Sequence, residues 1–416
     1  MNVGYILVYH IFAKNTIMKK LFRFLLKFIG IFLFLLLVIL IGFYFMVPIY
    51  TFSGPSVFSG EKLYNPYEKV DSTNWRKYNF QVQSKAWGGI TDGRKNSNEL
   101  IDSIYNSLGF DHVATSDYQK INYFGKQNPS FIPTYEHGYN IFKTHQVCID
   151  ADKVLWVDFM FFQTLSMKQW IFDNLNKDSR IVAMAHPLLL NGYTINEMKH
   201  LTNYKLMEVL NNVRVSFDHW DMALSSGHLV WMLANDDAHD VVNSNEVGRR
   251  FTMINSPTTN KEDILNNLES GNAYGFDFYR HDDEPMQTKI ERSKYIPHLN
   301  SAKLIGDTLE VSVSQKAVRF TFIGQGGKKM AVAHNTKSAK YLITSNDTYV
   351  RTVIKFADSS SIYLNPVVRY DGEKPVSQLR AEINTRATLW LRITYFLIAL
   401  VLVYFYARRK QKKSGK

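Results

Sequence analysis

The chain contains very little cysteine: Cys148 is its one cysteine among 416 residues. A single thiol excludes an intramolecular disulfide. Cys148 lies in the apolar run "HQVCI", where a small core side chain is a better interpretation than a nucleophile. The fold must therefore form without covalent cross-links within the chain. A length of 416 residues allows two or three domains or one large α/β barrel.

The middle of the chain also lacks an excess of charge of either sign. The formal net charge is +12, but eleven lysines and arginines lie beside the two apolar runs described below. The basic balance therefore belongs to the flanks of those runs, and no basic stripe marks a nucleic-acid surface between them. We expect no nucleic-acid partner.

Charge is absent from residues 28–50, "FIGIFLFLLLVILIGFYFMVPIY", which are long enough to cross a bilayer as a helix. A cleavable signal peptide is the alternative, but no convincing small-residue cleavage site is present. A second apolar run, residues 388–407, carries Trp390, Tyr404 and Tyr406 where aromatic belts are expected. For this run the alternative is a buried C-terminal helix, which the polybasic tail disfavours.

Eleven of the chain's 49 lysines and arginines lie on the outer flanks of the two runs, in residues 1–27 and 408–416. Basic flanks stay on the cytoplasmic side of a membrane. We therefore expect a double-pass membrane protein with both termini cytoplasmic and with the central domains on the outer side.

Between the two runs, the pattern changes once. Residues 78–277 alternate short apolar runs with amphipathic ones, which predicts repeated βα units and a parallel sheet, as a barrel or an open sheet. Residues 295–372 contain strand patterns bounded by turn residues, with no helix between them. They predict a small antiparallel β-sandwich appended to the α/β domain.

Several predicted strands of residues 78–277 end in polar or ionisable residues. These are Asp117, His186, Glu208, Asp236, Asp237 and His239. In an α/β barrel the carboxyl ends of the strands meet on one face, and His, Asp and Glu there are natural ligands for zinc, manganese or iron. Each residue also has a simpler interpretation: His186 as a hydrogen-bonded core histidine, "DDAH" as a helix N-cap, and Glu136 with His137 as loop residues.

The ordered motifs "SLGFDHVATSDY", "YEHGYNIFKTHQ", "VAMAHP" and "ANDDAH" resemble those of the polymerase and histidinol phosphatase (PHP) family of metal-dependent phosphoesterases. The resemblance covers roughly residues 78–277. It implies a distorted (β/α)7-type barrel with as many as three divalent metal ions, zinc, manganese or iron, at the carboxyl ends of the strands.

Carried over residue by residue, the resemblance implies a set of metal ligands. These are Asp92, Glu136, His145, His186, Asp237 and His239. Glu136 would bridge two metals, with His145 and His186 completing one of those two sites. Asp237 would be the carboxylate of the neighbouring site, and His239 a ligand of the third. Glu136, Asp237 and His239 are the residues that the resemblance assigns to catalysis.

The departures from the family pattern are equally specific. Gln81 and Gln83 replace the histidines of the first motif, and Tyr118 replaces a histidine of the second. Neutral amide oxygens are poor substitutes for imidazole on a transition metal. Three functions follow: an outward-facing hydrolase of a phosphorylated small molecule or surface saccharide phosphate with a reduced metal set, an inactive relative that binds a ligand or partner, and a structural envelope component.

Overall fold

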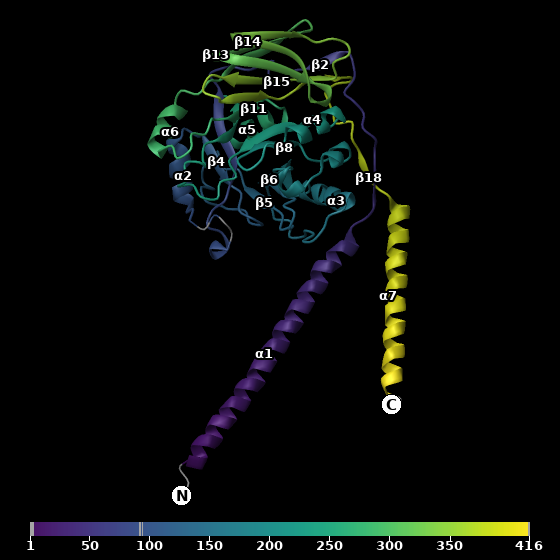
Figure 1. Ribbon diagram of the computed structural model, residues 1–416. Coiled ribbons are helices and arrows are strands. Elements are labelled where there is room, and N and C mark those ends of the chain that lie inside the picture. The colour runs from purple at the N-terminus through teal and green to yellow at the C-terminus, as the bar shows by residue number, and fades with distance from the viewer. Residues whose placement is uncertain (1–3, 91–92, 94, 415–416) are drawn as a thin grey trace. The chain divides into compact units, whose positions relative to one another are not determined.

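The computed structural model describes residues 4–90, 93 and 95–414, and divides into two units. One unit comprises residues 1–47 and 389–416, and the other comprises residues 48–388. The first holds α1 (Gly4–Met46) and most of α7 (Thr385–Ser414), drawn in purple and yellow in Figure 1.

Both of these helices are long and apolar enough to cross a membrane. The stretches concerned are Met18–Met46 and Thr385–Lys412, whose most apolar 18-residue segments have mean hydropathies of 3.1 and 1.9. Only 6% of that segment in the second stretch is buried, so it is not the buried C-terminal helix that was the alternative interpretation. The first helix ends at Met46 rather than at residue 50, because Pro48 cannot continue it and Tyr50 already belongs to a strand.

The described part of residues 48–388 contains three sheets. Two short strands, β1 (Tyr50–Phe52) and β18 (Ala381–Ile383), pair antiparallel with each other. A five-stranded sheet has the order β5 (Thr134–His137), β6 (Gln146–Ala151), β7 (Ser179–Met184), β8 (Leu206–Asn211) and β9 (Trp231–Asn235). An eleven-stranded sheet contains β2 (Lys62–Tyr64), β3 (Trp75–Val82), β4 (His112–Thr115), β10 (Arg250–Asn255), β11 (Ala273–Asp277), β12 (Leu299–Ile305), β13 (Thr308–Gly324), β14 (Lys328–Leu342), β15 (Tyr349–Phe356), β16 (Ser361–Leu364) and β17 (Val367–Tyr370).

Five α-helices lie between the strands: α2 (Asn98–Ser107), α3 (Leu165–Leu175), α4 (Phe217–Ser225), α5 (Lys261–Glu269) and α6 (Met286–Ser293). Helix α2 shows how the sequence specifies them. Ser97 caps its first turn by accepting a hydrogen bond from the backbone N–H of Leu100, and Ile101 and Tyr105 bury one face. The chain leaves the helix at Gly109, whose φ of 77° suits a residue without a Cβ.

Among the described residues, neither large sheet closes on itself, so the chain has a mixed α/β fold built on open sheets. Strands β3 and β4 are parallel, as are β7, β8 and β9, while β5 and β6 are paired antiparallel. Two isolated parallel bridges, Val82 with Ala238 and Tyr118 with Glu136, connect the two sheets at the carboxyl ends of β3 and β4.

The antiparallel strands expected in residues 295–372 are present as β12 to β17. They do not form a sheet of their own, because β16 pairs with β11 and so continues the sheet that contains β10 and β3. Figure 1 shows β13 and β14 at one end of this unit, with α3 and β18 toward the other end.

Asp236, one of the polar residues expected at a strand end, has a structural role. Its buried carboxylate accepts hydrogen bonds from five donors: Asn79 Nδ2 (3.0 Å), Tyr105 Oη (2.9 Å), and the backbone N–H groups of Gly248 (2.6 Å), Arg249 (2.8 Å) and Arg250 (2.8 Å). These donors belong to β3, to α2 and to the chain entering β10. One side chain thus joins four elements around the end of β9.

We predict that Asp236→Asn lowers the free energy of unfolding by roughly 3 kcal/mol. The NH2 group of the amide is itself a hydrogen-bond donor, and it would lie against the N–H and O–H donors that now bond to the carboxylate. Thermal unfolding of the full chain in detergent measures the change. Asp102→Asn, on the exposed face of α2, is the control and should leave the unfolding temperature within about 1 °C. Equal stability of the two variants would contradict the role assigned to Asp236.

Candidate metal centre

Strand β5 presents two ionisable side chains, and successive residues of a strand point to opposite faces. His137 is fully engaged on its own face: Nδ1 lies 2.6 Å from Gln146 Oε1, and Nε2 lies 3.0 Å from the backbone carbonyl of Val157. His137 is therefore a buried structural histidine. Glu136 faces the other way, toward side chains from neighbouring strands.

Glu136, His145 and His186 come together in the structure. Glu136 Oε1 lies 2.6 Å from His145 Nδ1 and 3.3 Å from His186 Nε2, and the three potential ligand atoms lie within 4.8 Å of one another. His145 directly precedes β6, and His186 follows the end of β7, so three adjacent strands supply one residue each. All three side chains are buried.

The electrostatics of this group show why it suits a cation. Burial raises the pKa of Glu136, but the charges and hydrogen bonds of His145 and His186 outweigh burial and hold that pKa well below its usual range. Burial lowers the pKa of His186, yet its hydrogen bond to Glu136 and the charge of Asp237 raise it to about 9. Burial dominates at His145, whose pKa is lowered. The carboxylate thus keeps one positive partner, the role that a bound metal ion fills when the imidazole is deprotonated.

The backbone at this group is held in uncommon conformations. His186 has a φ of 26° and Asp237 a φ of 50°, values that residues with a Cβ rarely adopt. Glu208 Oε2 accepts a hydrogen bond of 2.9 Å from the backbone N–H of His186 and so helps to hold this turn. Burial raises the pKa of Glu208 to about 8. Strained residues of this kind cluster at functional sites.

The two glutamines of the first strand behave differently. Gln83 Nε2 donates hydrogen bonds to Glu136 Oε2 (2.6 Å) and to the carbonyl of Ser116 (2.9 Å), so Gln83 reaches the predicted site. The register of β3 with β4 shifts between Asn79 and Val82, so two residues that stand two apart in this stretch do not have to point to the same side. Neither polar atom of the buried Gln81 side chain has a hydrogen-bond partner.

The remaining expected ligands are only partly placed with this group. Asp237 Oδ1 lies 3.5 Å from His239 Nε2, and Asp237 Oδ2 accepts a hydrogen bond of 3.0 Å from Asn211 Nδ2. Asp237 and His239 therefore form a pair with each other, and their role as ligands stays a prediction. Asp92 lies outside the described residues. Tyr118 packs its ring against the ring of His145, with 5.4 Å between the centroids.

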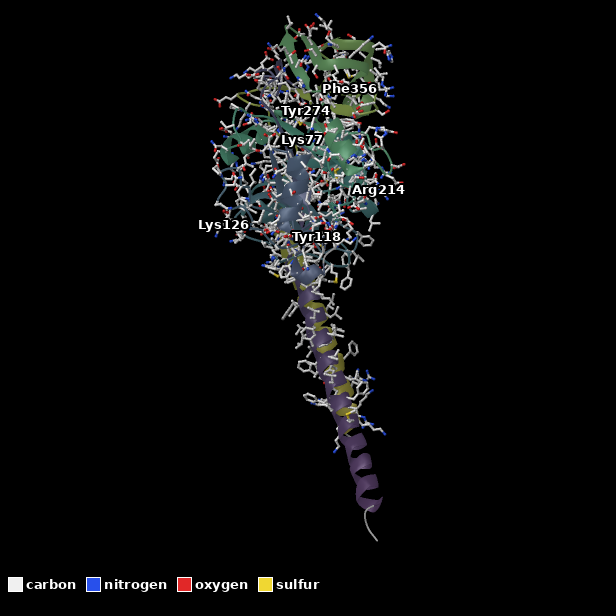
Figure 2. All side chains as sticks on the ribbon, turned by 90° about the vertical axis from the view of Figure 1, so that its left-hand side faces the viewer. Lys77, Tyr118, Lys126, Arg214, Tyr274 and Phe356 are labelled. Atoms are coloured by element: carbon white, nitrogen blue, oxygen red, sulfur yellow. The ribbon has the colours of Figure 1, made fainter. Side chains whose placement is uncertain are left out.

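A cleft of about 560 Å³ adjoins the group, and sequence reasoning did not find it. Its wall includes Trp87, Tyr118, Lys143, His145 and Trp156. The two tryptophan rings meet edge to face, with centroids 6.1 Å apart, although each residue comes from a different loop. Figure 2 shows Tyr118 at the opposite end of this unit from Phe356 of β15. No local pattern in the sequence indicates that these two tryptophans meet.

No protein-family model and no curated protein match the chain. Among solved structures, the chain is similar to a two-domain protein of Bacteroides vulgatus that contains a predicted PHP-like metal-dependent phosphoesterase. The two share 10% sequence identity, and the alignment covers 78% of this chain and 100% of that one with a TM-score of 0.39. A score this low does not establish a common fold.

We predict that the full chain, purified in detergent, retains about one divalent metal ion per molecule, since three protein ligands leave an open position typical of a catalytic site. His145→Ala and His186→Ala should each abolish retention, as measured by elemental analysis. His137→Gln is the matched control, because this buried histidine lies next to Glu136 but points away from it. Loss of metal in the control as well, at an unchanged unfolding temperature, would contradict the assignment.

Proposed function

We propose that residues 78–277 form a metal-dependent phosphoester hydrolase of the PHP type with a reduced metal set. The observation that carries the proposal is the buried group of Glu136, His145 and His186, one residue from each of three adjacent strands. Imidazole and carboxylate ligands suit zinc, manganese or iron. When bound, such an ion polarises a phosphoryl oxygen and lowers the pKa of a water molecule to make a nucleophile near neutral pH.

The strand arrangement supports a distorted barrel. The two isolated bridges connect β4 to β5 and β3 to the end of β9, so the strands β3 to β9 follow one another around a ring of seven. Among the described residues, these bridges would join the ring at the carboxyl ends of β3 and β4, near Glu136 and Asp237. This is the face on which α/β barrels collect catalytic residues.

Within this proposal the chain's own residues have distinct tasks. Gln83 holds one carboxylate oxygen of Glu136, and Glu208 positions the backbone of His186. Lys143, at the wall of the cleft, offers a positive charge for a phosphate group. Asp237 and His239, paired 3.5 Å apart, would take up and return a proton during hydrolysis.

The two apolar helices would anchor the enzyme in a membrane. Their outer flanks are basic, which favours cytoplasmic termini and an outward-facing position for residues 48–388. A phosphorylated small molecule or a surface saccharide phosphate would suit that location as substrate.

We predict that Glu136→Gln and His186→Ala lower the metal-dependent hydrolysis of a generic phosphomonoester or phosphodiester by about a hundredfold or more, because they remove ligands that the reaction depends on. The full chain in detergent is assayed with added zinc, manganese or iron after chelation. His137→Gln should retain most of the activity. Absence of any metal-dependent hydrolysis in the wild type would overturn the proposal.

A second function, ligand binding without catalysis, is favoured by one specific contact. Gln83 Nε2 donates to Glu136 Oε2 at 2.6 Å, and so occupies the oxygen that a second bridged metal would need. An inactive relative would keep the fold and the cleft while using them to hold a ligand or a partner in the envelope.

The variant Gln83→His tests this second reading. An imidazole in that position removes the amide donor and adds a ligand, so metal content should rise above that of the wild type. Gln287→His, at an exposed glutamine of α6, is the control. An unchanged metal content in Gln83→His would show that the first strand no longer contributes to a metal site.

A further inference from the structure

The loops around the cleft expose an unusual number of large apolar side chains. We call the following six residues the apolar rim: Trp87, Ile141, Phe142, Trp156, Phe161 and Phe162. Between 41% and 60% of each residue is exposed. Contiguous exposed apolar surface on a folded unit marks an interaction site rather than ordinary surface.

Short contacts connect the rim to the wall of the cleft. Trp87 and Trp156 are both in the cleft wall and contact each other. The backbone N–H of Ile141 donates to the carbonyl of Met160 at 3.0 Å, which ties the loop of residues 139–143 to the loop that carries Phe161 and Phe162. Three loops distant in sequence therefore form one surface next to His145.

The two chain segments that lead to the apolar helices lie at the same end of the unit as the apolar rim. The backbone N–H of Tyr50 donates to Ser166 Oγ at 3.2 Å, four residues beyond Phe162, and Tyr50 Oη donates to Asp173 at 2.7 Å. The backbone N–H of Ile49 donates to Thr388 Oγ1 at 3.0 Å, so the two segments are held together. The pairing of β1 with β18 extends this junction.

Almost no linker separates this junction from the helices. Helix α1 ends at Met46, and residue 48 already belongs to the second unit, so the connection spans at most about 7 Å when fully extended. Helix α7 begins at Thr385, within the second unit itself. If the helices cross a bilayer, the surface beside Tyr50 and Ser166 is held within a few residues of the membrane interface.

The composition of the rim matches that interface. Tryptophan favours the headgroup level, because one end of its ring is apolar while its indole N–H is hydrated. Phenylalanine and isoleucine suit the apolar face that a surface-bound segment buries beside the acyl chains. Two lysines add positive charge at the rim: Lys120 Nζ lies 5.9 Å from the centre of a Trp87 ring, and Lys143 Nζ lies 5.9 Å from that of Tyr118. Aromatic groups with nearby lysines are suited to a surface of anionic lipid.

We infer that the apolar rim rests on the bilayer entered by the two apolar helices, and that the metal centre acts on a phosphate ester carried by a membrane lipid. The second half of this inference rests on the proposed function. Figures 1 and 2 share their vertical axis, and α3, β18 and Tyr118 all lie toward the end of the unit away from β14. The cleft would then open at the depth of the lipid headgroups, with Lys143 beside the phosphate.

The test places a fluorescent label on the rim of the full-length chain in nanodiscs of phosphatidylethanolamine and phosphatidylglycerol that include doxyl-labelled lipid. Ile141→Cys carries the label, and Val332→Cys on β14 is the matched control, with exposed fractions of 55% and 46% for the native residues. Cys148 does not interfere, because burial raises the pKa of its thiol to about 12 and keeps it inaccessible and protonated.

We expect the doxyl lipid to quench most of the fluorescence at position 141 and little of it at position 332. Equal quenching at both positions would overturn the inference. A label at position 141 that is shielded from water but not quenched would also overturn it, since a protein rather than lipid would then cover the rim.

Hydrolysis assays in the same nanodiscs separate this inference from the proposed function. The wild type should hydrolyse a lipid phosphomonoester, phosphatidic acid, about tenfold faster or more than a water-soluble phosphomonoester, because docking raises the effective concentration of the lipid. Faster hydrolysis of the soluble ester would overturn the lipid substrate while leaving the proposed function intact. Quenching at position 141 without hydrolysis of either ester would support docking and count against the proposed function.

Discussion

The burial of one carboxylate, that of Glu136, is the constraint on which the centre of this molecule depends. A charge removed from water is costly unless cationic and hydrogen-bonding partners surround it. Here His145, His186 and Gln83 supply those partners from three different places in the sequence. The strands that carry them are thereby drawn to the same point, and β4 meets β5 at the isolated bridge between Tyr118 and Glu136.

Asp236 shows that a buried acid alone does not indicate a metal. Its carboxylate is saturated by five donors, three of them backbone N–H groups, and these donors leave it a structural role. Glu136 instead faces two imidazoles whose ring nitrogens can bind a metal ion. The distinction lies in the chemistry of the neighbours, which is why residues of similar appearance at the ends of strands have different tasks.

The sequence indicated much of this arrangement and missed identifiable parts. The strands and helices of residues 78–277 follow from alternating apolar patterns, and Glu136, His145 and His186 were expected together from their ordered motifs. The shift of register in β3 was not visible, because a β-bulge depends on pairing with β4 rather than on the residues of one strand. The cleft was missed for a related reason: Trp87 and Trp156 meet only after distant loops pack.

By itself, the sequence determined the two apolar helices, the mixed α/β class and the identity of the side chains available for a metal, since these depend on local composition and on short-range periodicity. Only the tertiary structure decided which ionisable residues share a site, which glutamine touches Glu136, and which apolar side chains remain exposed beside the cleft. Those properties depend on distances between segments far apart in the chain, and no local pattern encodes them.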